Sequence, residues 1–178
     1  MFCRVISYEP GDNNSYELQW GPLMDKDVED WFSTSKTRHD NVRKRTLVVN
    51  DIDRFYPPLA DWMHDNFKFL PNWRMDDCQI SLAEDMGGIG PHVDNYDVFL
   101  IQMSGSRRWQ VGCEKLSTKT EISRSIPHLD VRVLDRWGEN DEFEDWILQP
   151  GDMLYLPPRI GEFYLISLCC PSFILHQY

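Results

Sequence analysis

The amino-acid sequence predicts a mainly β domain, a sandwich or a barrel, with a few short helices near its start. From Met75 onward the side chains alternate in character, with Cys78, Ile80 and Leu82 on one side of the segment, which is the period of a strand. Several further short apolar segments follow, and turn residues separate them. Seven tryptophans and an aromatic content of 13% indicate a folded chain. Because 178 residues can bury a sizeable core, we expect one domain over residues 1–178.

The elements expected before residue 75 are two strands, two helices and a loop. Residues 16–20 and the β-branched segment 46–49 are predicted strands. Residues 25–32 begin with acidic side chains and fit a short helix. Apolar residues recur at helical spacing over 57–66, which predicts a helix whose first turn holds two prolines. The basic segment 33–45 is predicted to be a solvated loop.

The later part of the chain is predicted to add short strands to the one that starts at residue 75. Composition and period do not choose between a sandwich and a barrel for them. The expected strands are residues 97–103, 107–111, 131–134, 145–148 and 153–156.

Charge and cysteine usage restrict the classes of partner and compartment. A formal net charge of −11 argues against direct binding to nucleic acid and favours a basic partner. The five cysteines are odd in number and lack Cys-x-x-Cys spacing, so we expect the cytoplasm or an organelle interior and not secretion. Neither a signal peptide nor an apolar run of the ~18 residues that span a membrane is visible.

The first candidate site is the pair His92 and Asp94, which follows a glycine-rich bend at residues 87–90. Alternate side chains of a strand share a face, so both can point at one object. An imidazole and a carboxylate are two of the three ligands of the 2-His-1-carboxylate iron site. The alternative is a pair at a hairpin edge whose members only hydrogen-bond each other.

Four segments carry a resemblance to a known family. Residues 90–99 read GPHVDNYDVF and residues 105–112 read GSRRWQVG. Residues 71–77 (PNWRMDD) and 150–158 (PGDMLYLPP) complete the pattern. Together they resemble the JmjC-type, cupin-fold ribosomal oxygenases, and most of all the branch that hydroxylates an arginine of a large-subunit ribosomal protein. The likeness covers residues 7–160.

The resemblance implies a fold, two cofactors and a set of roles. It implies a double-stranded β-helix, in which His92 and Asp94 bind Fe(II) and a ribosomal protein side chain, an arginine in this branch, is hydroxylated with 2-oxoglutarate. Arg107 matches the arginine that binds the 2-oxoglutarate carboxylate, which suits a guanidinium fork, and Ser81 matches a second contact. Tyr96 shares the parity of the ligand pair and would line the substrate pocket, although core packing explains it equally well. We expect the ligand pair and Arg107 around one cavity. The alternative for Arg107 is a structural ion pair. Relatives of this kind form dimers, and the oligomeric state of this chain stays open.

One position departs from the family pattern. The family's third ligand is a histidine a few residues after the Leu-Pro-Pro turn, and here Glu162 stands in that place. Residues 161–178 then form a divergent tail, so we expect a truncated chain and a barrel that is incomplete at this end. A second carboxylate would shift metal preference toward Mn or Mg. Two functions therefore stay open, an Fe(II)/2-oxoglutarate-dependent hydroxylase that is impaired or a catalytically inactive peptide-binding or non-functional isoform. A cupin isomerase would need more histidines.

Overall fold

A computed structural model describes residues 3–9, 15–24, 26, 44–127, 129, 131–135, 142–166 and 170–177. Its strands are β1 (Cys3–Glu9), β2 (Ser15–Trp20), β3 (Lys44–Val49), β4 (Met75–Ala83), β5 (His92–Val93), β6 (Asp97–Gln102), β7 (Arg107–Lys115), β8 (Phe143–Leu148), β9 (Met153–Leu156), β10 (Ile160–Ile166) and β11 (Cys170–Gln177). Its helices are α2 (Ile52–Phe55), α3 (Pro57–Asn66), a 3₁₀ turn (Asn72–Arg74) and α4 (Thr118–Arg124).

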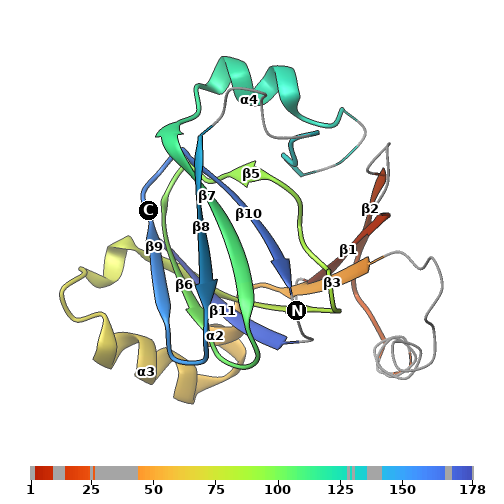
Figure 1. Cartoon of the computed structure of the whole chain (residues 1–178). Coiled ribbons are helices and arrows are strands. Elements are labelled where there is room, and N and C mark those ends of the chain that lie inside the picture. The colour runs from red at the N-terminus through yellow and green to blue at the C-terminus, as the bar shows by residue number, and fades with distance from the viewer. Residues whose placement is uncertain are drawn as a thin grey trace.

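The described residues form two antiparallel sheets. The larger sheet has the strand order β2-β1-β3-β4-β11-β6-β9, and the smaller has the order β5-β10-β7-β8. Figure 1 shows the strands wrapped around a common interior, with α4 at one end and α2 and α3 at the other. The prediction of a mainly β fold is confirmed.

The main core lies between the sheets, because buried side chains of both sheets contact one another there. Trp109 of β7 is 1% exposed, and it packs with Val98 and Leu100 of the larger sheet. Burial of this apolar surface is the main stabilising contribution to such a fold. The same cluster includes Ile6, Val48, Ala83, Leu148 and Leu156.

A second core joins α3 to the outer face of the larger sheet. Leu59 and Met63 of this helix pack with Cys78 of β4 and Phe99 of β6. The rings of Phe67 and Phe99 lie 5.1 Å apart edge to face, a favoured aromatic geometry. The predicted helix over 57–66 is confirmed with the same bounds. It leaves the opposite face of β4 to the interior.

The end of the chain differs from the prediction of an incomplete barrel. β10 pairs with both β5 and β7, and β11 pairs with both β4 and β6 in the middle of the larger sheet. The physical reason is that strand formation needs only β-forming residues and neighbours with free ladder positions. Pro171 is the second residue of β11, where a missing amide hydrogen is tolerated more easily than in mid-strand.

At two other places the structure differs from the prediction because long-range contacts determine the local conformation. Residues 131–134 make two isolated bridges in place of a strand, His92 with Val133 and Ser125 with Leu134. The predicted loop 33–45 ends within β3, where Arg45 forms an ion pair of 2.8 Å with Glu84 instead of standing in solvent. The rest of that loop and the predicted helix 25–32, Lys26 apart, lie outside the described residues. β1 and α4 were not predicted.

Within the described part of the chain, none of the helices has the length and apolar character that crossing a membrane requires.

Candidate metal centre

The candidate ligands lie on two paired strands. β5 runs antiparallel to β10, and Glu162 lies directly opposite His92 in their register. Side chains at directly opposite positions project to the same face and come close together. Asp94 follows His92 by two residues and projects to that face as well. The register therefore brings together one imidazole and two carboxylates.

Two glycines shape the bend that leads into β5. Gly90 has φ +98°, in the left-handed region, and a Cβ there would lie 2.5 Å from Cγ1 of Val133. At Gly87 a Cβ would lie 2.8 Å from the carbonyl oxygen of Arg45. Larger residues would thus clash or strain the backbone, and the direction of β5 depends on both glycines.

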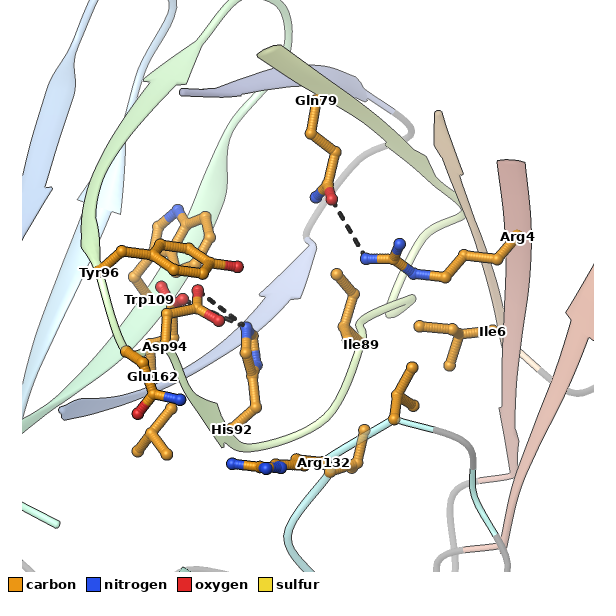
Figure 2. A pocket seen from close by; sticks show the side chains of 14 residues that line it. Arg4, Ile6, Gln79, Ile89, His92, Asp94, Tyr96, Trp109, Arg132 and Glu162 are labelled. Atoms are coloured by element: carbon orange, nitrogen blue, oxygen red, sulfur yellow. Dashed lines mark hydrogen bonds and ion pairs between the residues drawn. The ribbon is translucent and has the colours of Figure 1, made fainter. Parts of the chain in front are cut away.

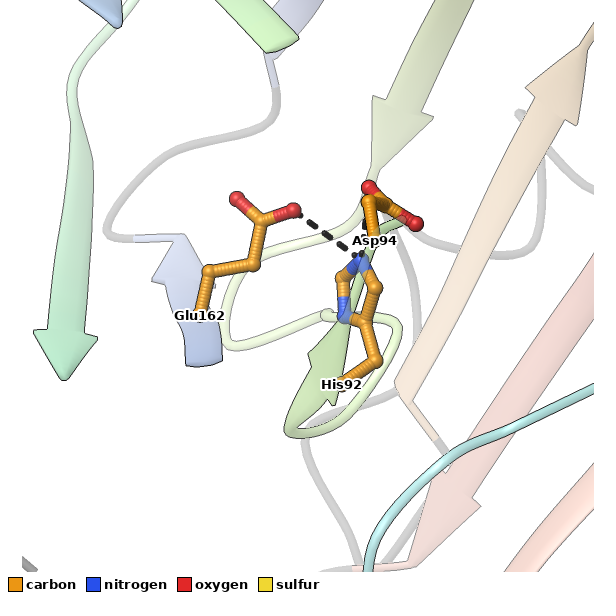
Figure 3. Close-up of side chains that lie close together, drawn as sticks. All are labelled: His92, Asp94 and Glu162. Atoms are coloured by element: carbon orange, nitrogen blue, oxygen red, sulfur yellow. Dashed lines mark ion pairs between the residues drawn. The ribbon is translucent and has the colours of Figure 1, made fainter. Parts of the chain in front are cut away.

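The three side chains meet at one point, as Figure 3 shows. Nε2 of His92 lies 3.2 Å from Oε1 of Glu162 and 3.9 Å from Oδ2 of Asp94. One potential ligand atom from each residue lies within 4.8 Å of the others. Glu162 is 3% exposed, and the other two side chains are mostly buried. This spacing suits a single divalent metal ion.

The ring of His92 is oriented by its second nitrogen. Nδ1 lies 3.0 Å from the carbonyl oxygen of Gly90. When Nδ1 carries a proton it donates to that carbonyl, which leaves Nε2 as the free lone pair toward the carboxylates. The glycine bend therefore selects the tautomer that a metal would need.

Burial and the neighbouring charges shift the ionisation of the centre. Burial alone would lower the pKa of His92, but the Glu162 carboxylate and then Asp94 outweigh it and raise that pKa to about 9. Burial raises the pKa of Glu162, Asp94 raises it further, and His92 opposes both. Without metal, the pair of His92 and Glu162 thus retains a proton at neutral pH.

The centre opens into a cavity of about 250 Å³. His92, Asp94 and Glu162 line one wall together with Tyr96, and Arg4 and Gln79 lie on the opposite wall (Figure 2). The remaining lining residues are Ile6, Ile89, Val93, Asn95, Trp109, Val131, Arg132 and Val133.

The basic groups of the cavity are held by polar partners. Arg4 donates from Nη2 to Oε1 of Gln79 at 3.1 Å and from Nη1 to Oδ1 of Asn50 at 2.9 Å. Arg4 and Gln79 were not predicted as lining residues, and Arg4 lies on β1, a strand that was not predicted. The alternation along β4 did mark the side of Gln79 as its more polar face.

Arg107 and Ser81 lie together but outside this lining. Arg107 is fully buried, donates from Nη1 to Oγ of Ser81 at 2.9 Å, and stacks 5.7 Å from the ring centre of Trp109. Trp109 itself lines the cavity. The structure thus brings together His92, Asp94, Glu162 and Tyr96, while Arg107 and Ser81 form a second polar group beside Trp109.

Arg159 and Glu121 were not predicted as site residues either; Arg159 contacts the Asp94–Asn95 segment, and Glu121 contacts Arg159. Arg159 donates to the side chain of Asn95 at 2.9 Å and to Glu121 at 2.5 Å. Arg159 is 64 positions from Asn95 and 38 from Glu121 in the sequence, so no local pattern connects it to either.

Comparison with known proteins agrees with this geometry. The family model of the JmjC domain matches residues 62–162. The chain is 36% identical over 155 residues to the ribosomal protein uL16 3-hydroxylase of Escherichia coli, which covers 87% of this chain and 35% of that protein. It is 31% identical over 161 residues to a probable ribosomal oxygenase of Haemophilus influenzae, covering 90% of the chain and 36% of the relative. The chain thus spans about a third of the length of these curated relatives.

Two solved structures are similar to the chain over nearly its whole length. The X-ray structure of Escherichia coli ycfD aligns with a TM-score of 0.74 and 30% identity, over 99% of this chain and 41% of that one. A structure of the same ribosomal oxygenase in complex with cobalt and 2-oxoglutarate aligns with a TM-score of 0.71 and 28% identity, over 99% and 40%. The cupin fold of these proteins is the fold of the present chain.

Proposed function

The chain belongs to the JmjC domain family, and on this premise we propose that it is an Fe(II)- and 2-oxoglutarate-dependent hydroxylase of a ribosomal protein side chain. The observation that carries the proposal is the convergence of His92, Asp94 and Glu162 within 4.8 Å at the wall of a cavity. Relatives named as a ribosomal protein hydroxylase and a ribosomal oxygenase support the choice of substrate class.

The residues present fit a divalent metal. Oε2 of Glu162 is buried and accepts no hydrogen bond within the described residues, so one carboxylate oxygen is left for a cation. His92 would supply Nε2, and Asp94 and Glu162 would each supply an oxygen. Iron with 2-oxoglutarate supplies activated oxygen when bound in such a centre. The additional carboxylate in place of the family's histidine favours Mn or Mg more than the usual ligand set does.

We assign 2-oxoglutarate recognition to Arg107 with Ser81. A fully buried guanidinium requires an anionic or polar partner, and a carboxylate fits its fork with two parallel hydrogen bonds. Trp109, whose ring centre lies 5.7 Å from the Arg107 guanidinium carbon, lines the cavity and connects it with this group. Holding the acid by its far carboxylate would orient it toward the ligand wall.

Tyr96 would contact the side chain to be hydroxylated, and we propose arginine as that side chain. Tyr96 lies on the ligand wall of the cavity, so a substrate beside it would be close to the metal centre. The net charge of −11 favours a basic ribosomal protein. Arg4 and Arg132 would repel a second guanidinium, but each already has polar partners in the structure.

A second candidate function is a non-catalytic, peptide-binding domain. The observation in its favour is the ion pair between His92 and Glu162, which satisfies the imidazole at 3.2 Å without any metal. A cavity that holds such an ion pair can still bind a basic peptide.

One experiment separates the two functions. The protein is stripped with a chelator and titrated with Fe(II), Mn(II) and Co(II) under anaerobic conditions, with Asp94→Asn as the metal-ligand control. Succinate release is then measured in air-saturated buffer, which supplies the O2, with Fe(II), 2-oxoglutarate and a peptide of ribosomal protein uL16. Metal binding that depends on Asp94, together with peptide-dependent succinate release, is the expected result. Peptide binding without metal binding or succinate release would establish the non-catalytic function instead.

A further inference from the structure

We propose that Arg159 is a positioning residue for the metal centre, and that the buried carboxylate of Glu121 fixes it in that role. The inference rests on the proposed metal centre and adds to it the contacts that hold β10 and residues 92–95, here called the ligand loop, in place. Arg159 lies three residues before Glu162, in the turn that leads into β10. Three residues accept hydrogen bonds from the side chain of Arg159, namely Asn95, Leu116 and Glu121. We call them, together with Arg159, the Arg159 clamp.

The backbone of Arg159 joins two segments. Its amide donates to the carbonyl oxygen of Asp94 at 2.8 Å, and its carbonyl accepts from the amide of Leu116 at 2.8 Å. One of these bonds therefore ends on a candidate metal ligand. The turn before β10 cannot move without changing the backbone that carries Asp94.

The side chain of Arg159 joins the same two segments and adds a third contact, to Glu121 of α4. Nη1 donates to Oδ1 of Asn95 at 2.9 Å and to Oε2 of Glu121 at 2.5 Å. Nε and Nη2 both donate to the carbonyl oxygen of Leu116, at 3.1 and 2.7 Å. A planar guanidinium with donors in a fixed geometry can hold three separate segments in this way, which an ammonium cannot.

Glu121 is the anchor of the Arg159 clamp. It is 0% exposed within α4, so its charge requires close partners. Its second oxygen, Oε1, accepts from Nη1 of Arg132 at 3.2 Å. The residue after Arg132 is Val133, which bridges to His92. The buried carboxylate thus connects β10 on one side to the segment that covers His92 on the other.

The conformation of Arg159 indicates that these contacts determine the turn. Its φ of 72° lies in the left-handed region, which a side chain with a Cβ adopts at a cost of about 1–3 kcal/mol. Such a conformation persists where surrounding contacts over-determine it. Here the contacts come from the Asp94–Asn95 segment and from Leu116 and Glu121.

The expected consequence is on metal affinity. Partners that orient metal ligands typically change affinity or activity by about 10- to 100-fold when they are mutated. We test Arg159→Lys, which keeps the charge but loses the fork, and Glu121→Gln, which keeps the shape but loses the charge. Arg108→Lys is the matched control, because Arg108 makes an exposed two-pronged pair with Asp145 that does not touch the centre.

Two measurements are made on each folded variant. Mn(II) affinity is measured by the EPR signal of the free ion, and hydrogen–deuterium exchange of the chelated protein is followed in peptides that cover residues 92–95 and 159–162. We expect both clamp variants to lose about 10- to 100-fold in Mn(II) affinity and to exchange faster in both peptides. Arg108→Lys should match the wild type in both measurements. If either clamp variant fails to fold, Asn95→Ala removes one arm of the Arg159 clamp at an exposed position and should show a smaller change in the same direction.

Wild-type Mn(II) affinity and exchange in folded Arg159→Lys and Glu121→Gln would overturn the proposal. If the wild-type protein binds no Mn(II), the proposed metal centre fails, and the exchange of the chelated proteins alone still decides whether Arg159 positions the ligand loop.

Discussion

Replacing Glu162 by glutamine in the metal-free protein should remove a pH dependence of stability that the wild type shows. In the wild type the carboxylate of Glu162, 3.2 Å from Nε2 of His92, raises the pKa of His92 from 6.5 to about 9 against the effect of burial. Because one pH unit corresponds to 1.36 kcal/mol, this difference amounts to about 3 kcal/mol. The Glu162→Gln variant keeps the shape of the site but lacks the charge.

The folded state binds the proton more tightly than the unfolded state, and this sets the direction of the pH dependence of stability. The folded protein holds the proton on the pair of His92 and Glu162 up to about pH 9, whereas the unfolded chain releases it near pH 6.5. The stabilisation is therefore fully present below pH 6.5 and is lost as the pH rises through 9. In Glu162→Gln, Asp94 at 3.9 Å is the acidic group left to oppose the effect of burial on His92, so most of this loss should disappear.

The assay is urea unfolding followed by tryptophan fluorescence, in chelator, at intervals between pH 6 and 9.5. We expect the free energy of unfolding of the wild type to fall by up to about 3 kcal/mol more than that of Glu162→Gln over this range. Asp145→Asn is the control, since its carboxylate pairs with Arg108 on the surface, and its curve should parallel the wild type. Parallel curves for the wild type and Glu162→Gln would refute the reasoning.

The remaining predictions concern ligands, thiols and the core. Asp94→Ala should abolish specific Mn(II) binding in an EPR titration while changing the free energy of unfolding by less than about 1 kcal/mol, because this carboxylate is partly exposed and lies 3.9 Å from the imidazole. Glu162→His should shift metal preference from Mn(II) toward Fe(II) and Co(II), measured by competition, because it restores a second imidazole. Iodoacetamide at pH 8 should label exposed Cys113 and leave Cys78 unmodified in peptide mass spectra of the native protein, because burial raises the pKa of the Cys78 thiol. Trp109→Ala should lower the free energy of unfolding by about 3–5 kcal/mol in urea titrations, because it removes a fully buried indole.

Elements that depend on local pattern were predictable from the sequence. The helix over 57–66 and the strand over 153–156 have the predicted bounds, and the strand expected over 97–103 ends one residue earlier. The period of apolar residues and the turn residues at their ends determine such segments. The placement of His92 beside Asp94 belongs to the same class, since it depends only on strand parity.

Features that depend on distant partners were not predictable in this way. The alternation along β4 indicated a strand, but not that Gln79 and Ser81 face the interior, because α3 covers the apolar face that holds Cys78. The position of β11 between β4 and β6 likewise depends on pairing over long sequence distances. The contact of Arg159 with Glu121 joins a turn to a helix that was itself not predicted.

The register of β5 and β10 separates two properties of the candidate centre that the sequence alone could not separate. Glu162 lies opposite His92 because of backbone pairing, so whichever side chain stands at this position points to the ligand face. The location of a third ligand is therefore a property of the fold. Its chemistry is a property of the side chain, and glutamate gives the centre one negative charge more than histidine would, with two hard oxygen donors in place of one. That charge raises the pKa of His92 to about 9, so a metal must compete with a proton that a centre with two imidazoles would not hold as tightly. Metal affinity should accordingly rise with pH up to that value.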